Sequence, residues 1–164
     1  PIVITHTMNV FGERQHPEKF IPLCIRRILN NETILIHSNS ECTQAGSRHY
    51  IHAGDVADGL MFILNIDVKE LPQDFGGAKC PKFNLVGLEE VDNLTLAQTI
   101  STIMNRPLNY KMVDFHSSRP GHDLRYAMSG KFMQELGWQP KSRLSQRIAQ
   151  VVNWTLSNNR WLKI

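Results

Sequence analysis

The chain has 164 residues, of which 41% are hydrophobic and 20% are charged, and its formal net charge is +3. This composition is typical of one globular domain and excludes an intrinsically disordered chain. The mild positive charge suits an anionic small ligand, whereas the lack of a dense Lys/Arg run argues against nucleic acid, and no apolar run is long enough to span a membrane.

Apolar runs alternate with amphipathic segments along the chain. We expect strands at about 2–5, 34–36, 49–52, 82–86 and 109–113, and helices at about 18–30, 55–65, 94–105, 129–136 and 144–158. This alternation predicts an α/β fold. The first run, Ile2-Val3-Ile4, is typical of a parallel strand covered on both faces, and it suggests that the chain begins in the middle of a fold.

Two of the helices carry specific packing predictions. Asp55 is the expected N-cap of the helix at 55–65, because its carboxylate can accept from the first backbone N–H groups. The residues of that helix expected to face inward are Val56, Leu60, Ile63 and Leu64. In the last helix, one apolar face is predicted to consist of Leu144, Ile148, Val151, Val152 and Thr155.

The most informative segment runs from Arg119 to Tyr126 and reads Arg-Pro-Gly-His-Asp-Leu-Arg-Tyr. Pro120 and Gly121 interrupt regular structure, so the flanking side chains are expected on a shaped loop. A planar guanidinium can give two parallel charge-assisted hydrogen bonds to a phosphate. The segment is therefore interpreted either as a phosphate site or as a solvated surface loop.

Other polar residues could join this loop in a diphosphate cradle. Asn9 is expected in the loop after the first strand, where α/β folds place ligand contacts. Lys19 begins a helix, and Arg48 precedes a short extended segment. With Arg119 and Arg125 they form a plausible anion site, although Lys19 is equally interpreted as a solvated helix residue.

Asn84 and the histidines give weaker signals. Asn84 stands in a predicted strand where an apolar residue is expected, and the alternative to a ligand contact is a satisfied buried amide. His49 and His52 are three apart on an extended segment and point to opposite faces, so we expect no metal site. The cysteines (Cys24, Cys42 and Cys80) have no paired spacing, which predicts free thiols, Cys24 buried, and a cytoplasmic location.

Residues for hydride chemistry are missing from the sequence. No Gly-x-x-Gly-x-x-Gly motif follows a strand, so no dinucleotide phosphate site is predicted. There is also no Tyr-x-x-x-Lys pair, since Asp114 and Gly130 stand four residues after Tyr110 and Tyr126. The sequence therefore predicts a ligand-binding chain without its own cofactor site.

Six motifs in order carry a resemblance to a known family. They are Asn9-Val-Phe-Gly12, His16-Pro-Glu-Lys-Phe-Ile-Pro22, Arg48-His-Tyr-Ile-His52 with Asp55-Val-Ala, Phe83-Asn-Leu-Val-Gly87, Arg119 to Tyr126, and Leu136-Gly-Trp-Gln-Pro140. Together they resemble the C-terminal part of the dTDP-glucose 4,6-dehydratases, nucleotide-sugar enzymes of the extended short-chain dehydrogenase/reductase family. The second and fifth motifs are the most specific, and the sixth is shared more widely with epimerases and decarboxylases.

The resemblance implies roles for seven residues as substrate contacts. By this likeness Asn9, Arg48 and Arg119 contact the diphosphate, Lys19 lies in the substrate pocket, Asn84 lies near the nucleotide, and His122 and Tyr126 lie beside Arg119. Three departures stand against this pattern. Ile36-His37-Ser38 replaces the family's Ile-Tyr-Gly, whose tyrosine approaches the base; the connection at 66–81 is longer than expected; and Asn9-Val-Phe replaces the commoner Asn-Asn-Tyr.

The resemblance also implies a fold and a function. Residues 1–164 would form the C-terminal substrate-binding part of an extended Rossmann-type short-chain dehydrogenase/reductase, starting at a strand of the Rossmann sheet and lacking the N-terminal NAD-binding part. The implied enzyme is an NAD-dependent homodimer that oxidises C4 of a nucleotide-diphosphate sugar, eliminates water across C5–C6 and returns the hydride to C6. We expect this chain alone to bind no NAD and to be inactive. Two alternatives stay open: a nucleotide-sugar 4-epimerase or UDP-sugar dehydratase fragment, and a non-catalytic nucleotide-sugar-binding module.

Overall fold

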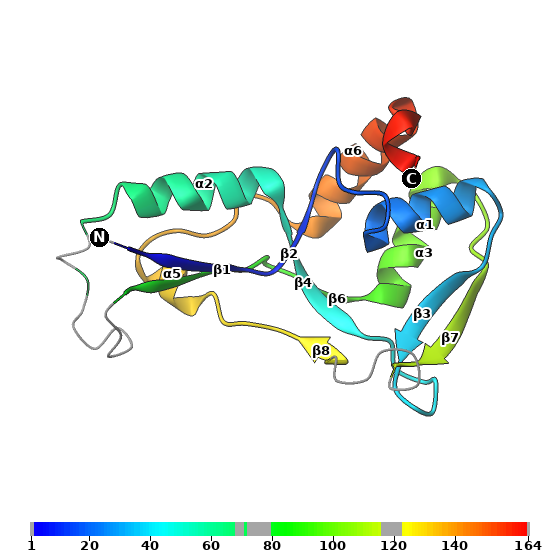
Figure 1. Ribbon diagram of the computed structural model, residues 1–164, viewed down its shortest axis with the longest axis horizontal. Helices are drawn as coiled ribbons and strands as arrows, with labels where there is room; N and C mark the ends of the chain where they lie inside the picture. Colours follow the sequence, from blue (N-terminus) through cyan, green and yellow to red (C-terminus); the bar gives the residue numbers. More distant parts are fainter. Residues whose placement is uncertain (1, 68–70, 72–79, 116–122, 164) are drawn as a thin grey trace.

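The computed structural model describes residues 2–67, 71, 80–115 and 123–163. Short strands and helices alternate, in the order β1 (Ile4–Thr7), β2 (Asn9–Phe11), α1 (Phe20–Leu29), β3 (Ile34–Ser38), β4 (Ser47–His52), α2 (Ala53–Leu64), β5 (Lys82–Leu85), β6 (Glu90–Asp92), α3 (Asn93–Met104), β7 (Tyr110–Asp114), β8 (Arg125–Tyr126), α5 (Lys131–Glu135), α6 (Leu144–Ser157) and a 3-10 helix (Asn159–Leu162). The predicted α/β class is confirmed, and the figure shows two groups of elements at opposite ends of the molecule (Figure 1).

Parallel pairing dominates the three small sheets. β1 pairs with β5, and β3 pairs with β7, in both cases parallel. β4 is the most connected strand: its second half pairs with β2, and its first half pairs with β6 in the antiparallel sense and with β8 in the parallel sense. β4 therefore brings together segments that lie far apart in the sequence.

Two hydrophobic clusters form on the two sides of β4. The larger cluster lies among α1, α3 and α6 and includes all four apolar residues predicted on the inward face of α6, namely Leu144, Ile148, Val151 and Val152. The smaller cluster lies between α2, β5 and α5 and consists of Ile51, Ile63, Phe83, Leu85, Met133 and Trp138. Adjacent residues of β4 point to opposite faces, and accordingly Tyr50 joins the first cluster and Ile51 the second.

The predictions for α2 were partly wrong. His52, not Asp55, is the N-cap, because its Nδ1 accepts from the Gly54 N–H at 3.1 Å. Asp55 is instead buried and accepts from the Lys141 backbone N–H at 3.1 Å and from the Ser142 hydroxyl at 2.6 Å. Leu60 and Leu64, expected inside, are 40% and 74% exposed.

The start of the chain also differs from expectation. The first strand covers Ile4–Thr7 rather than residues 2–5. Three of its residues are half-buried and His6 is exposed, so the strand is not buried on both faces in the described part of the structure. Asn9 belongs to a second strand, β2, and not to a loop. Among the described residues, no helix has the length and apolarity needed to cross a bilayer.

Candidate functional site

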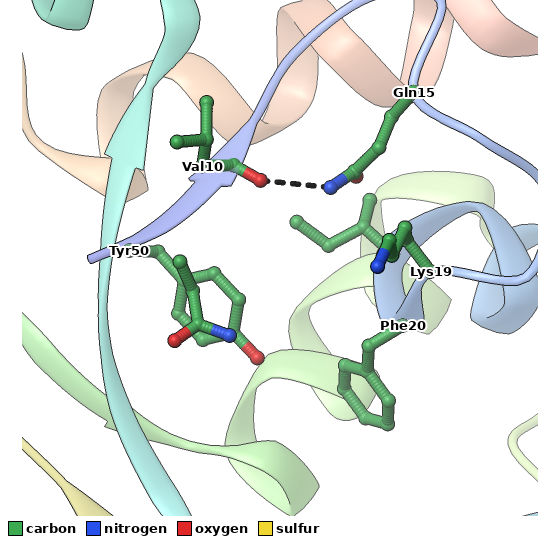
Figure 2. Close-up of a pocket in the computed structure, with 7 residues that line it drawn as sticks. Val10, Gln15, Lys19, Phe20 and Tyr50 are labelled. Carbon is green, nitrogen blue, oxygen red and sulfur yellow. Dashed lines mark hydrogen bonds between the residues drawn. The ribbon is translucent and has the colours of Figure 1, made fainter. Parts of the chain in front are cut away.

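A cavity of about 520 Å³ collects three of the predicted site residues. Asn9 comes from β2, Lys19 from the N-cap position of α1, and Arg48 from β4. A neighbouring cavity of about 310 Å³ shares Asn9 and Lys19 with it, together with Phe20 and Tyr50 (Figure 2). The parallel register that sets Asn9 opposite Tyr50 explains why two residues that lie far apart in the sequence share one wall.

The cavity has chemically different walls. Its polar lining includes a lysine and an arginine, and its apolar and aromatic lining consists of Phe20, Leu23, Leu35, Tyr50 and Phe115. His37 also lines it and meets the Phe115 ring edge to face, with the centroids 5.5 Å apart and an interplanar angle of 79°. A cationic side next to aromatic side chains suits a ligand that combines an anionic group with a flat ring.

The N-terminus of α1 borders both cavities, since Lys19 and Phe20 line each of them. Lys19, Phe20 and Ile21 contribute to the cavity walls, and Lys19 as N-cap offers no side-chain acceptor to the first backbone N–H groups. Such a helix start carries a partial positive charge and attracts anions. Lys19 itself is exposed and makes no side-chain hydrogen bond or ion pair with the part of the chain that the structure describes. The helix start and the ammonium group therefore add to one positive region.

Arg48 is held by backbone carbonyls of its own chain. Its guanidinium donates to the carbonyls of Ser47 at 2.5 Å, Leu124 at 2.7 Å and Asp123 at 2.8 Å. The Ser47 N–H donates to the same Leu124 carbonyl at 3.1 Å. Arg48 therefore fastens the start of β8 to β4 as well as bordering the cavity.

Arg125 does not join the cradle that the sequence suggested. Its Nε and Nη2 donate to the two carboxylate oxygens of Glu90 at 2.7 and 2.8 Å. Glu90 also accepts from the Ser47 hydroxyl at 2.7 Å, and His49 Nε2 lies 3.6 Å away. The hydrogen bonds from Arg125, then that from Ser47, lower the pKa of Glu90 to about 2. Arg125 thus holds β8 against β6 and β4.

The remaining predicted residues lie elsewhere. Asn84 is on β5, outside the linings of the two cavities described above, where its Nδ2 donates to the Ser129 carbonyl at 3.0 Å and its Oδ1 lies 3.3 Å from His6 Nδ1. These contacts hold the amide of a half-buried strand residue, and a ligand contact of Asn84 stays a prediction. Tyr126 is exposed at the end of β8. Arg119 and His122 lie outside the described residues, and no group of three or more possible metal ligands occurs in the described part.

Among the lining residues that the sequence reasoning missed are Tyr50 and Asn93, which form a hydrogen bond with each other. Tyr50 is buried in the cavity wall, and its hydroxyl donates to Asn93 Oδ1 at 3.0 Å. The alternation of β4 places Tyr50 on the same face as Arg48, and that signal could have found it. Asn93 is the first residue of α3 and directly follows β6, and the antiparallel pairing of β6 with β4, which sets Asp92 opposite Ser47, brings it to the cavity.

Comparison with known proteins shows which enzymes the chain resembles. The model of the NAD dependent epimerase/dehydratase family matches residues 1–75. A dTDP-glucose 4,6-dehydratase from Escherichia coli is 28% identical over 171 residues, which cover 98% of this chain and 43% of that protein.

The fold comparison points the same way. The crystal structure of a dTDP-glucose 4,6-dehydratase from Streptomyces venezuelae with NAD and TYD bound matches 98% of the chain and 45% of its own length, with a TM-score of 0.76 and 28% identity. The chain is thus similar to dTDP-glucose 4,6-dehydratases over nearly its whole length, and its first 75 residues match the family model.

The family likeness extends to epimerases at the level of fold. A UDP-glucuronic acid 4-epimerase from Bacillus cereus, solved with UDP-glucuronic acid and NAD, matches 96% of the chain with a TM-score of 0.76 and 19% identity. The chain spans less than half the length of the relatives described above. The mixed α/β architecture with parallel strands is therefore that of the Rossmann-type enzymes of this family.

Proposed function

We propose that this chain binds a nucleotide-diphosphate sugar as the substrate-binding part of an NAD-dependent dTDP-glucose 4,6-dehydratase. The observation that carries the proposal is the 520 Å³ cavity in which Asn9, Lys19 and Arg48 converge from three separate elements. Two cationic side chains and the start of α1 favour a diphosphate. The aromatic lining suits a nucleotide base.

The similarity to dehydratases supports the choice of reaction. A solved structure that is 28% identical to this chain is a dTDP-glucose 4,6-dehydratase with NAD and TYD bound. In the proposed enzyme NAD would accept the hydride from C4 of the sugar and return it to C6. The described residues of this chain would bind the diphosphate, orient the sugar and exclude water from it.

No residue of this chain is assigned to NAD. The 164 residues contain neither a Gly-x-x-Gly-x-x-Gly motif nor a Tyr-x-x-x-Lys pair. The backbone of a glycine-rich turn is what lets a dinucleotide pyrophosphate approach a helix start closely. We therefore expect the purified chain to bind dTDP and to form no 4-keto-6-deoxy sugar.

Lys19→Ala is the cleanest test of the binding proposal. The side chain of Lys19 has no partner among the described residues, so its removal should leave the fold intact. The affinity for dTDP, measured by isothermal titration calorimetry, should fall about 3- to 10-fold, because one partly exposed charge contact with the ligand is lost. Lys131→Ala is the matched control, because Lys131 is an exposed lysine on α5 outside the cavity linings. Wild-type protein that shows no dTDP binding would refute the proposal.

Arg48→Ala should have a larger effect than Lys19→Ala. Truncating a fully buried, hydrogen-bonded charge contact costs on the order of 2–5 kcal/mol, and Arg48 is half-buried, so its loss should lie near the lower end of that range. Part of that loss would come from the release of Asp123 and Leu124. Arg48→Lys separates the loss of the ligand contact from the loss of the two carbonyl contacts. It keeps the positive charge but removes the planar guanidinium that donates to both carbonyls. Unchanged dTDP affinity in both Arg48 variants would contradict a role of this wall in binding.

A further inference from the structure

Residues 12–19, the segment between β2 and α1, carry part of the candidate site, and we call this segment the site loop. Its Gln15 and Lys19 line the 310 Å³ cavity (Figure 2). Gln15 Nε2 donates to the Val10 carbonyl at 2.8 Å. The backbone of Arg14 has a left-handed φ of 63°, which is unfavourable for a residue with a Cβ. Such a conformation persists only where surrounding contacts hold it, so the loop needs anchors.

Glu13 provides one such anchor, because its carboxylate contacts two other elements. Oε2 lies 3.3 Å from Nε2 of His52, the last residue of β4. Oε1 accepts from Nε2 of Gln150, on α6, at 3.3 Å. Gln150 is itself oriented, since its Oε1 accepts from Arg147 Nη1 at 3.1 Å. The site loop is therefore held to β4 and to α6 through one side chain.

His52 is a fixed partner for this carboxylate. Its Nδ1 accepts from the Gly54 N–H, so the neutral ring carries its proton on Nε2, the nitrogen next to Glu13. The His52 and Glu13 side chains are only 10% and 22% exposed. His52 Nε2 is buried and makes no aligned hydrogen bond within the described ranges, so the carboxylate beside it is what compensates its burial. A Cβ at Gly12 would lie 3.6 Å from the same nitrogen, so the site loop also begins close to this ring.

We propose that Glu13 is a positioning residue: by bridging His52 and Gln150 it fixes the site loop and thereby places the Lys19 ammonium at the cavity. The Lys19 backbone N–H donates to the His16 carbonyl at 2.9 Å, so a turn within the loop connects the anchored part to the start of α1. The proposal rests on the proposed function, in which Lys19 binds the diphosphate. It also assigns a favourable role to a carboxylate near an anion site, where charge alone would be unfavourable.

Glu13→Ala tests the positioning by the sign of its effect. If Glu13 acted only through its charge, its removal would strengthen the binding of an anion. We expect the affinity for dTDP, measured by isothermal titration calorimetry at fixed ionic strength, to fall about 2- to 5-fold, and by no more than in Lys19→Ala, through which Glu13 acts. Unchanged or stronger binding by Glu13→Ala would overturn the proposal.

Glu13→Gln is the conservative variant that should restore binding. It removes the charge but keeps the length of the side chain and one oxygen for His52 Nε2. It should therefore bind dTDP at least about 2-fold more tightly than Glu13→Ala, since an oriented contact is kept and a repulsive charge is lost. Equal affinities of the two variants would contradict a role of the bridge.

A double-mutant cycle with Lys19→Ala tests the route of the effect. If Glu13 acts by placing the Lys19 ammonium, its loss should cause no further weakening of dTDP binding once that ammonium is gone. A general structural role would instead weaken binding equally in both backgrounds, and that additive result would overturn the proposal. If Glu13→Ala lacks a cooperative thermal transition, Glu13→Asp takes its place in the cycle, because the shorter side chain keeps the charge but cannot reach both partners.

Controls separate this inference from the proposed function. Glu41→Ala removes a carboxylate from an exposed turn outside the linings of the two cavities described above, and it should bind dTDP no more weakly than wild type. A loss there equal to that of Glu13→Ala would count against the specific bridge. Wild-type protein that does not bind dTDP refutes the proposed function and this inference together, whereas wild-type binding with an additive cycle refutes this inference alone.

Discussion

The region around α1, α3 and α6 and the region around α2 differ in how completely their helices bury their apolar side chains. In the first, three helices close over one cluster, and Cys24, Ile25 and Ile100 have no exposed surface. In the second, one long helix lies along β1 and β5 with α5 on the other side (Figure 1), and it leaves Leu60, Met61 and Leu64 exposed by 40%, 59% and 74%. The candidate site lies on the closed region, which can hold its side chains in fixed positions.

β4 is the element that joins the two regions. Its alternating side chains send Tyr50 into one cluster and Ile51 into the other. Gly87, in the connection between β5 and β6, lies directly against the backbone of Tyr50. The two regions therefore meet where the backbone at Gly87 contacts the backbone of β4 at Tyr50.

Gly87→Ala should have the largest effect on stability. A Cβ at Gly87 would lie 1.9 Å from the Tyr50 carbonyl oxygen, which is backbone and cannot move as a side chain can. Overpacking usually costs about 1–3 kcal/mol, and this clash should exceed that range or abolish cooperative unfolding in urea. Gly130→Ala is the control, since its Cβ would meet Val86 at 3.3 Å. Equal urea midpoints for the two variants would show that the close approach of Gly87 to the Tyr50 backbone does not limit stability.

Truncation of one core isoleucine in each region sharpens the comparison. Ile25→Ala in the closed region should cost about 2–5 kcal/mol of unfolding free energy, because three helices prevent collapse of the cavity. Ile63→Ala on α2 should cost less, since a helix with an open outer face can move toward the gap. Leu64→Ala, at an exposed position, should change the free energy by less than about 0.5 kcal/mol. A larger loss for Ile63→Ala than for Ile25→Ala would reverse the interpretation of the two regions.

Helical periodicity predicted the closed region better than the α2 region. In α6 the apolar residues form one stripe, and all five residues predicted on it are buried. In α2 the apolar residues surround the helix, so periodicity could not select the buried face. Gly59 selects it: a Cβ there would lie 2.7 Å from Leu85 Cδ2 and from Trp138 Cζ2, so only glycine allows this approach. That approach depends on two partners, Leu85 and Trp138, that lie far from Gly59 in the sequence, so local sequence does not reveal it.

The candidate site shows the same limit. Residue type and motif resemblance pointed to Asn9, Lys19 and Arg48, and the structure brings these three to one cavity. The same reasoning treated Arg125 as a phosphate contact, because an arginine beside a Pro-Gly break gives no sign of its partner. Glu90, thirty-five residues earlier, is that partner. Pairings of this kind arise from strand register, which the sequence alone does not specify for strands of two or three residues.

Glu90→Gln should have the smallest effect and the clearest dependence on pH. The pKa of Glu90 is lowered from 4.5 to about 2, first by the hydrogen bonds from Arg125 and Ser47. Because the folded-state pKa is lower than the unfolded one, the ionised carboxylate stabilises the folded state fully above about pH 4.5, and this contribution is lost as the pH falls from 4.5 toward 2. At pH 7 the substitution should lower the unfolding free energy by less than about 1 kcal/mol, as for a solvent-accessible pair.

Urea unfolding at pH 7 and pH 3 checks this sign, with Glu135→Gln as a control in an exposed pair on α5. The difference between wild type and Glu90→Gln should shrink at pH 3, because the wild-type carboxylate then contributes less. Glu90 holds β8 to the closed region through Arg125, and the Ser47 amide donates to Leu124 just before β8. In Glu90→Gln the rate of hydrogen exchange of the Ser47 amide at pH 7 should therefore be higher than in wild type. A difference that grows on acidification would mean that Arg125 and Glu90 do not stabilise this edge, and β8 would then depend on Arg48 and the backbone pairing with β4.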